Sequence, residues 1–143
     1  MLEDNKGVVL GCWEAANHKD SAGFDRYYDE NVVYHGGAGE IRGRENVKAY
    51  LLGFTKAFPD LKVTVEDIFG EGDRVFSRAR FQGTNTGELL GMPPTGKPID
   101  IRWMLNAARV ENGRIVEEWE VIDQLEILRQ LGLADAPVPT ASS

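Results

Sequence analysis

The sequence predicts an α+β fold, in which helices come first and a long antiparallel meander follows. Up to Pro59 the apolar residues recur at helical spacing, and beyond it they alternate as in strands. The turn sequences GEGD and ENG separate the alternating segments, as is typical of hairpins. A curved sheet covered by helices on one face leaves a cavity between the two layers, and such cavities commonly bind ligands.

Three helices are expected before the meander. The first begins near Asp4, and Ser21 is the expected cap of a short second helix. The segment DEN should end that helix, and VVYH is then expected to be a brief strand. A glycine-rich segment leads into a third helix that ends at Pro59. The apolar stripe of this helix consists of Val47, Tyr50, Leu51, Phe54 and Phe58.

Four strands and one helix are expected after Pro59. Strands at 62–69 and 74–81 form a first hairpin, and strands at 98–110 and 114–122 form a second. Between the hairpins lies the loop GELLGMPPTGKPI, whose two prolines restrict φ and remove backbone donors. The segment DQLEILRQLG is a short closing helix, with Asp123 as its cap and Gly132 as its C-terminal glycine.

Composition limits the classes of partner and cofactor. The chain of 143 residues, 42% of them hydrophobic, is expected to form one domain over 1–132 and a loose tail over 133–143. Its net charge of −7 argues against nucleic acid and membrane as partners. With Cys12 as the only cysteine and two histidines, neither a disulfide nor a metal site is expected. The acidic N-terminal segment is unlike a signal peptide, so we expect a cytoplasmic protein.

Two segments resemble motifs of the SnoaL-like polyketide cyclase family. The loop GELLGMPPTGKPI resembles the family's G.PPTG loop, and RVENGRIVEEWEVIDQLEILRQLG resembles its last strand and helix. The segment NVVYHGG at 31–37 also fits the family's first strand. The resemblance implies a nuclear-transport-factor-2-like fold, a cone-shaped barrel of a curved, mainly antiparallel sheet wrapped over N-terminal helices.

The resemblance also implies a chemistry. Family members perform intramolecular aldol condensations without metal or organic cofactor, using a buried carboxylate on the final strand and a histidine on the preceding one. The carboxylate position falls on Glu120 and the histidine position on Asn106. Glutamate can still act as a base, whereas asparagine can only donate a hydrogen bond to an oxyanion. We therefore expect Glu120 as base, with Asn106 and Arg102 stabilising the enolate.

This mechanism requires Glu120, Asn106 and Arg102 to converge in one cavity. Strict alternation divides the strand from Pro98 into two sides. The side with arginine and asparagine would ordinarily face solvent, but the resemblance implies that it lines the cone. The outer side would consist of Ile99, Ile101, Trp103, Leu105 and Ala107, and the inner side of Asp100, Arg102, Met104, Asn106 and Ala108.

Seven further residues are candidates for substrate binding. His35 is expected at the cavity mouth as a proton donor or polar contact, although a lone histidine is more often structural. The others could stack on or pack against a small hydrophobic carbonyl compound, aromatic ones included, but could equally be plain core. They are Trp13, Tyr28, Tyr34, Phe54, Met92 and Met104.

Other functions remain open at this point. The same fold supports isomerases, hydroxylases, epoxide hydrolases and non-catalytic ligand-binding domains. The hydrolases need an aspartate two residues after the arginine, and here Arg102 is followed at that spacing by Met104. The apolar outer side of the sheet suggests a homodimer or a higher homo-oligomer.

Overall fold

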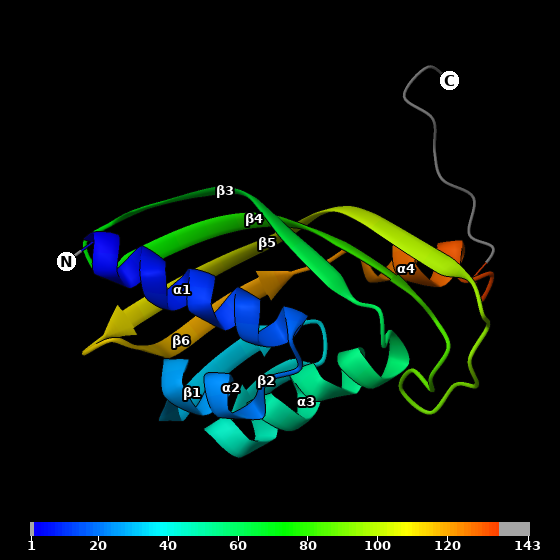
Figure 1. Ribbon diagram of the computed structural model, residues 1–143, viewed down its shortest axis with the longest axis horizontal. Helices are drawn as coiled ribbons and strands as arrows, with labels where there is room; N and C mark the ends of the chain where they lie inside the picture. Colours follow the sequence, from blue (N-terminus) through cyan, green and yellow to red (C-terminus); the bar gives the residue numbers. More distant parts are fainter. Residues whose placement is uncertain (1, 135–143) are drawn as a thin grey trace.

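The computed structural model describes residues 2–134, in which helices and a curved sheet form two layers (Figure 1). The first three helices lie against the concave side of the sheet, and the last one lies near one end of it. Most of the predicted tail, residues 135–143, falls outside the described residues. The helices are α1 (Leu2–Asn17), α2 (Ser21–Tyr27), α3 (Arg44–Ala57) and α4 (Gln124–Gln130).

The helix boundaries follow from local signals. The carboxylate of Asp20 caps α2 by accepting a hydrogen bond from the Gly23 amide at 3.0 Å, so the predicted cap at Ser21 is wrong by one residue. Asp123 caps α4 as predicted, accepting from the amide of Glu126 at 3.0 Å. Pro59 follows the end of α3, also as predicted.

The sheet has six strands among the described residues, in the order β2-β1-β6-β5-β4-β3. All neighbouring pairs are antiparallel except β1 and β6, which are parallel. The predicted α+β fold is confirmed, but β2 and β3 remain separate edges, so the sheet is curved and not closed. The strands are β1 (Tyr28–Gly36), β2 (Gly39–Arg42), β3 (Lys62–Glu71), β4 (Arg74–Thr84), β5 (Pro98–Glu111) and β6 (Arg114–Val121).

The hairpin formed by β1 and β2 differs from the sequence prediction. Strand β1 includes the DEN segment, where its pairing with β6 changes register between Tyr28 and Val33. Strand β2 lies within the segment predicted to be a glycine-rich loop. Most of β2 is exposed, so its sequence carries no alternating apolar pattern.

A β-bulge in β5 overturns the predicted alternation of this strand. Ala79 pairs with Met104 and Phe81 pairs with Ile101, so two residues of β5, Arg102 and Trp103, occupy the place of one. One extra residue reverses the side on which each following side chain lies. Strict alternation therefore fails at this point.

The bulge changes the predicted side of four residues, which are Ile99, Asp100, Ile101 and Arg102. Asp100 pairs with Arg80 outside the cavity. Ile99 and Ile101 are each only 3% exposed and pack into the core, whereas the prediction placed them on the outer side. Arg102 is exposed to solvent and does not line the cavity. Beyond the bulge, Met104 and Asn106 point inward, as predicted.

Candidate active site

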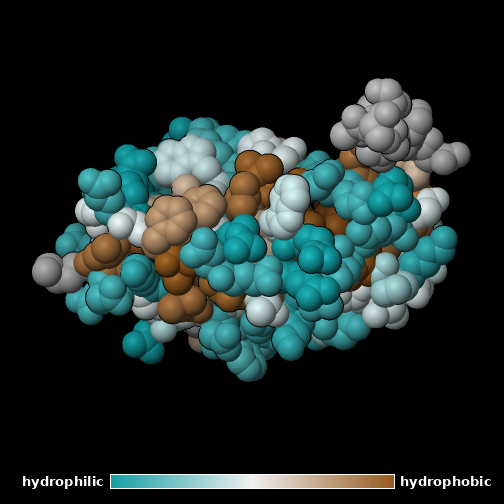
Figure 2. Space-filling view, turned by 90° about the horizontal axis from the view of Figure 1, so that it is seen from above, coloured by the Kyte–Doolittle hydropathy of each residue, from teal (hydrophilic) through white to brown (hydrophobic). Residues whose placement is uncertain are grey.

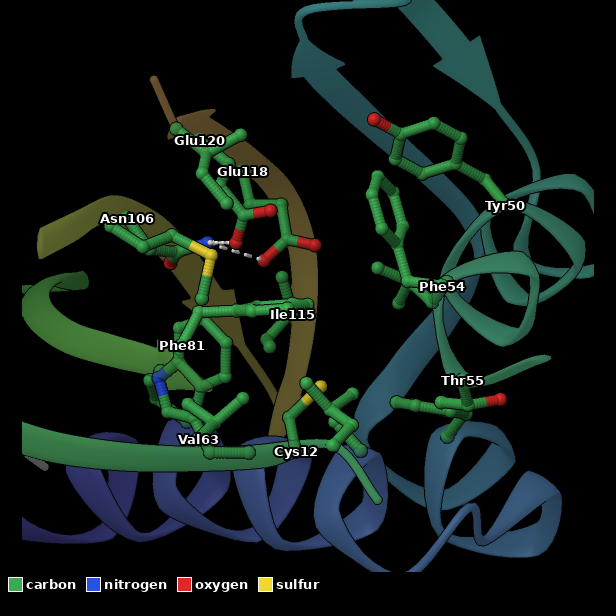
Figure 3. Close-up of a pocket in the computed structure, with 18 of the residues that line it drawn as sticks. Cys12, Tyr50, Phe54, Thr55, Val63, Phe81, Asn106, Ile115, Glu118 and Glu120 are labelled. Carbon is green, nitrogen blue, oxygen red and sulfur yellow. Dashed lines mark hydrogen bonds between the residues drawn. The ribbon is translucent and has the colours of Figure 1, made fainter. Parts of the chain in front are cut away.

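The cavity lies between α1, α2 and α3 and the concave face of the sheet (Figure 3). It contains about 700 Å³ of space up to its open side, but only about 60 Å³ admits the centre of a water-sized sphere. The cavity is therefore narrow. Most of its lining is apolar, and the side chains with polar atoms are Cys12, Trp13, Tyr28, Tyr50, Thr55, Asn106, Glu118 and Glu120.

Two glutamates of β6 point into this cavity. Glu118 and Glu120 are two residues apart on the strand, so their side chains leave the same face of the sheet. Glu118 is 3% exposed. Glu120 is partly exposed as a whole residue, but protein atoms enclose its carboxyl group. Two acidic groups thus share one apolar hollow.

Asn106 joins the two glutamates. It lies on β5 directly opposite Glu120 in the antiparallel ladder. Its Nδ2 donates to Oε2 of Glu118 and to Oε2 of Glu120, at 3.2 Å in each case (Figure 3). Since an amide nitrogen carries two hydrogens, both are directed to the carboxyl groups.

A tyrosine completes the hydrogen bonding of each glutamate. The Tyr28 hydroxyl donates to Oε1 of Glu118 in a short hydrogen bond. The Tyr34 hydroxyl donates to Oε1 of Glu120 at 2.7 Å. Both tyrosines belong to β1, which lies beside β6 in the sheet. Each carboxyl group therefore accepts one hydrogen bond from a tyrosine hydroxyl and one from the Asn106 amide.

Burial is the main electrostatic influence on the pair. It raises the pKa of Glu118 to about 7, and the nearby charge of Glu120 adds to the rise, while hydrogen bonds from Tyr28 and Asn106 oppose it. Burial also raises the pKa of Glu120, against the hydrogen bonds from Tyr34 and Asn106. Because the charge on Glu120 helps Glu118 to keep its proton, one proton on the pair near neutral pH is the arrangement that this geometry favours.

The sequence profile of the SnoaL-like polyketide cyclases matches residues 7–131. The chain belongs to the SnoaL-like polyketide cyclase family. This membership supports a cyclase-like role. No curated protein sequence matches the chain.

Solved structures agree with the family. IdmH from Streptomyces antibioticus, described as a candidate polyketide cyclase, is 35% identical with a TM-score of 0.79, over 90% of this chain and 98% of that one. AclR from Streptomyces galilaeus, described as a candidate hydroxylase, is 29% identical with a TM-score of 0.83, over 94% and 100%. A SnoaL-like protein from Jannaschia at 22% identity and a TM-score of 0.86, over 94% and 96%, supports the fold alone.

Most of the site residues predicted for this SnoaL-like protein are near the cavity. Glu120 and Asn106 line it, and so do four of the candidates for substrate binding: Trp13, Tyr28, Phe54 and Met104. Tyr34 lies behind them, where it bonds Glu120 and packs its ring 5.4 Å from that of Tyr50. Arg102 is separated from this group by the bulge, so the predicted convergence of three catalytic residues is wrong for Arg102.

His35 and Met92 are not where the sequence interpretation put them. Because Tyr34 points inward from β1, the adjacent His35 points outward. There its Nε2 lies 2.7 Å from Oε2 of Glu117, and its ring stacks on Trp119 at 5.3 Å. Met92 packs against the core from the loop and does not line the cavity.

Sequence reasoning missed the roles of two residues in the cavity. Glu118 lies two residues before Glu120 on a predicted strand, and that i, i+2 spacing was the available signal of a carboxyl pair. Tyr50 was assigned to the core stripe of its helix, although its side chain lines the cavity. Burial raises the pKa of the Tyr50 hydroxyl, and the charge of Glu120 adds to the rise.

Neither a metal-binding cluster nor a membrane-spanning helix occurs among the described residues. Across residues 2–134, no three side chains of His, Cys, Asp or Glu are grouped so that they could hold a metal ion. In the same residues, no helix has the length and apolar character that crossing a membrane requires.

Proposed function

We propose that this protein is a cofactor-independent enzyme of the polyketide cyclase type, which closes a ring in a small hydrophobic carbonyl compound by an aldol reaction. One observation carries the proposal: two carboxyl groups share a single amide donor inside an apolar cavity. Acid-base catalysis at neutral pH needs one group that is ionised and one that is protonated, and a buried pair with one shared proton supplies both.

In this mechanism Glu120 is the base. Its carboxylate removes a proton from the carbon next to a carbonyl group of the substrate. The resulting enolate carbon attacks a second carbonyl carbon of the same molecule, which forms the ring bond and an alkoxide. The alkoxide takes the proton of Glu118. The proton on Glu120 then returns to Glu118, so the cycle consumes no acid or base.

Asn106 and Tyr50 have different parts in the proposal. Both amide hydrogens of Asn106 already bond the carboxyl groups, so we assign it the positioning of the pair instead of enolate binding. The Tyr50 hydroxyl at the cavity wall is a suitable donor to the enolate oxygen. Arg102 is exposed and takes no part.

Deuterium exchange tests the base directly. The probe is 2-tetralone, a two-ring ketone with acidic hydrogens next to its carbonyl group, followed by NMR in deuterated buffer. The protein should accelerate exchange, and Glu120→Gln should reduce this acceleration at least ~100-fold, as expected for loss of a general base, while 2-tetralone still binds. The matched control is Glu66→Gln on the exposed side of β3, which should exchange like wild type.

Two results would contradict the proposal. If Glu120→Gln retained full exchange, another group would be the base. If the wild-type protein bound 2-tetralone without accelerating exchange, the cavity would be a non-catalytic binding site.

Hydroxylation is a second candidate, because AclR, described as a candidate hydroxylase, is 29% identical to this chain. The mass of the product separates the two reactions. Aldol ring closure leaves the mass unchanged or removes one water, whereas hydroxylation adds one oxygen atom.

We further propose that the protein forms a homodimer through the outer face of its sheet. Figure 2 looks onto this face, where apolar side chains form a broken band among polar ones. Trp103 is 65% exposed and Phe69 is 53% exposed, which is unusual for side chains of this size. The ring of Phe69 lies 4.9 Å from that of Phe76 on the neighbouring strand. Such a surface is suited to self-association.

A further inference from the structure

A second hollow lies on the other side of Tyr50 and Phe54 from the carboxyl pair. It runs between α3 and the first part of the PPTG loop, residues 87–91, and contains about 1030 Å³ of space that is open to solvent. Tyr50 and Phe54 line both this groove and the inner cavity. Their rings meet edge to face with centroids 5.2 Å apart. The two hollows are thus neighbours across one pair of aromatic side chains.

The wall of the groove is held in place by Asn85. This residue is 1% exposed, and its Nδ2 donates to the carbonyl oxygens of Ala57 at 3.3 Å and of Gly87 at 2.8 Å. Its Oδ1 accepts from the Thr95 amide at 2.9 Å, which fixes the returning side of the loop. A Cβ at Gly87 would lie 1.9 Å from the carbonyl oxygen of Lys56, so only glycine allows this close approach to α3. These contacts hold the loop in a fixed position against α3, where it forms one wall of the groove.

The surface of the groove is suited to apolar rings. Phe54 and Leu90 contribute apolar side chains, and Leu90 is 76% exposed. A Cβ added at Gly53 would meet no atom within 4 Å, so the groove is open over this turn of α3. Lys56 and Glu88 add one charge of each sign to the rim, so the groove has no strong preference for a charged ligand.

We propose that this groove is a second binding subsite, which holds the distal rings of an elongated polycyclic carbonyl compound while its reacting end lies at Glu118 and Glu120. The inference rests on the proposed function, because it takes the carboxyl pair as the reacting centre. The inner cavity is too narrow for a long substrate, since only about 60 Å³ admits the centre of a water-sized sphere. Tyr50 and Phe54, which line both hollows, mark the place where a longer molecule would extend into the groove.

The test compares 2-tetralone with 6-phenyl-2-tetralone, which carries one further ring. Binding of each is measured by calorimetry. Wild-type protein should bind the longer probe at least tenfold more tightly, because burying one more aromatic ring is worth at least ~1.4 kcal/mol. Gly53→Leu should remove this gain by filling the groove and leave the affinity for 2-tetralone unchanged.

A matched control is available in Gly7→Leu. Gly7 also lies within a helix, α1, and a Cβ there meets no atom within 4 Å, but it lines neither hollow. This variant should bind both probes like wild type. A second variant, Leu90→Ala, removes an exposed side chain from the groove and should lower the affinity for the longer probe alone, by a few-fold.

The subsite would be overturned if wild-type protein bound the two probes equally. It would also be overturned if Gly53→Leu weakened both probes by the same factor, since the groove would then be an access route and not a subsite. These outcomes are independent of the exchange assay. If wild-type protein accelerates deuterium exchange but binds the longer probe no more tightly, only the subsite is wrong. If it binds the longer probe more tightly but does not accelerate exchange, only the proposed reaction is wrong.

Discussion

Burying Glu118 beside Glu120 makes the fold less stable as the pH rises from acidic to neutral. The pKa of Glu118 rises from 4.5 to about 7 on folding, so between these values the folded state binds more protons than the unfolded state. Stability therefore falls as the pH rises through this window, and the loss is complete above pH 7. Below the unfolded value both states are protonated and the penalty vanishes.

Glu118→Gln should relieve this penalty, because a neutral amide has no charge to desolvate. The stability that the variant gains over wild type, as free energy of unfolding, should be larger at pH 8 than at pH 5 by ~2–3 kcal/mol. Urea denaturation at both pH values measures this difference. Any constant cost of altered hydrogen bonding cancels in the comparison. If the free energies of unfolding of variant and wild type differed by the same amount at both pH values, the raised pKa of Glu118 would be contradicted.

For single residues, the sequence was sufficient to predict which side chains line the cavity wherever the strand alternates regularly. Glu120 and Asn106 line the cavity as predicted, and the i, i+2 spacing explains why Glu118, whose role was missed, points the same way as Glu120. His35 was misplaced because the sequence does not reveal which face of β1 is inside. Tyr34 points inward, so its neighbour His35 points outward. The hydrogen bonds that join the pair, from Asn106, Tyr28 and Tyr34, bring together three strands and could not be derived from periodicity.

Among the elements, β5 carries the most consequential departure from regular geometry. Its bulge at Arg102 and Trp103 lets Ile99 and Ile101 enter the core on one side of the bulge while Met104 and Asn106 enter the cavity on the other. An alternating sequence with one extra residue resembles an uninterrupted strand, so pattern analysis missed it. The charged Asp100 and Arg102 on the apparent inner side were the local indications.

Substitutions just before the bulge and within it test this geometry. Ile101→Ala should lower the free energy of unfolding by ~2–5 kcal/mol, because a side chain only 3% exposed leaves a cavity. Arg102→Ala, at the adjacent exposed position, should change it by less than ~0.5 kcal/mol. Chemical denaturation measures both. If Arg102→Ala were the more destabilising of the two, Arg102 would point inward and the strand would alternate strictly, without a bulge.

For the whole molecule, the change from helical to alternating periodicity was enough to predict the α+β class. The parallel pairing of β1 with β6 and the open edges at β2 and β3 depend on contacts between distant segments, which local patterns do not specify. The outer sheet face was predicted to be apolar through Ile99, Ile101 and Trp103. Trp103 is exposed as predicted, whereas Ile99 and Ile101 are buried. The other exposed apolar residues of this face are Phe69 and Val121.

Sedimentation velocity tests the homodimer proposed for this face. Wild-type protein at micromolar concentration should sediment as a dimer, and the double variant Phe69→Glu and Trp103→Glu should sediment as a monomer, because opposing negative charges would meet across the interface. Leu10→Glu on α1, also an exposed apolar position, is the control and should remain dimeric. A monomeric wild type, or a dimeric double variant, would show that this face is not the interface.

The most direct test of the carboxyl pair is a pH titration of the glutamate side-chain carboxyl carbons by 13C NMR, in wild type and in the Glu118→Gln and Glu120→Gln variants. One carboxyl group should titrate near pH 7, the signal should be absent from Glu118→Gln, and in Glu120→Gln it should move to lower pH because the neighbouring charge is gone. If every glutamate titrated below pH 5, the cavity would hold two ordinary carboxylates and the proposed acid-base chemistry would fail.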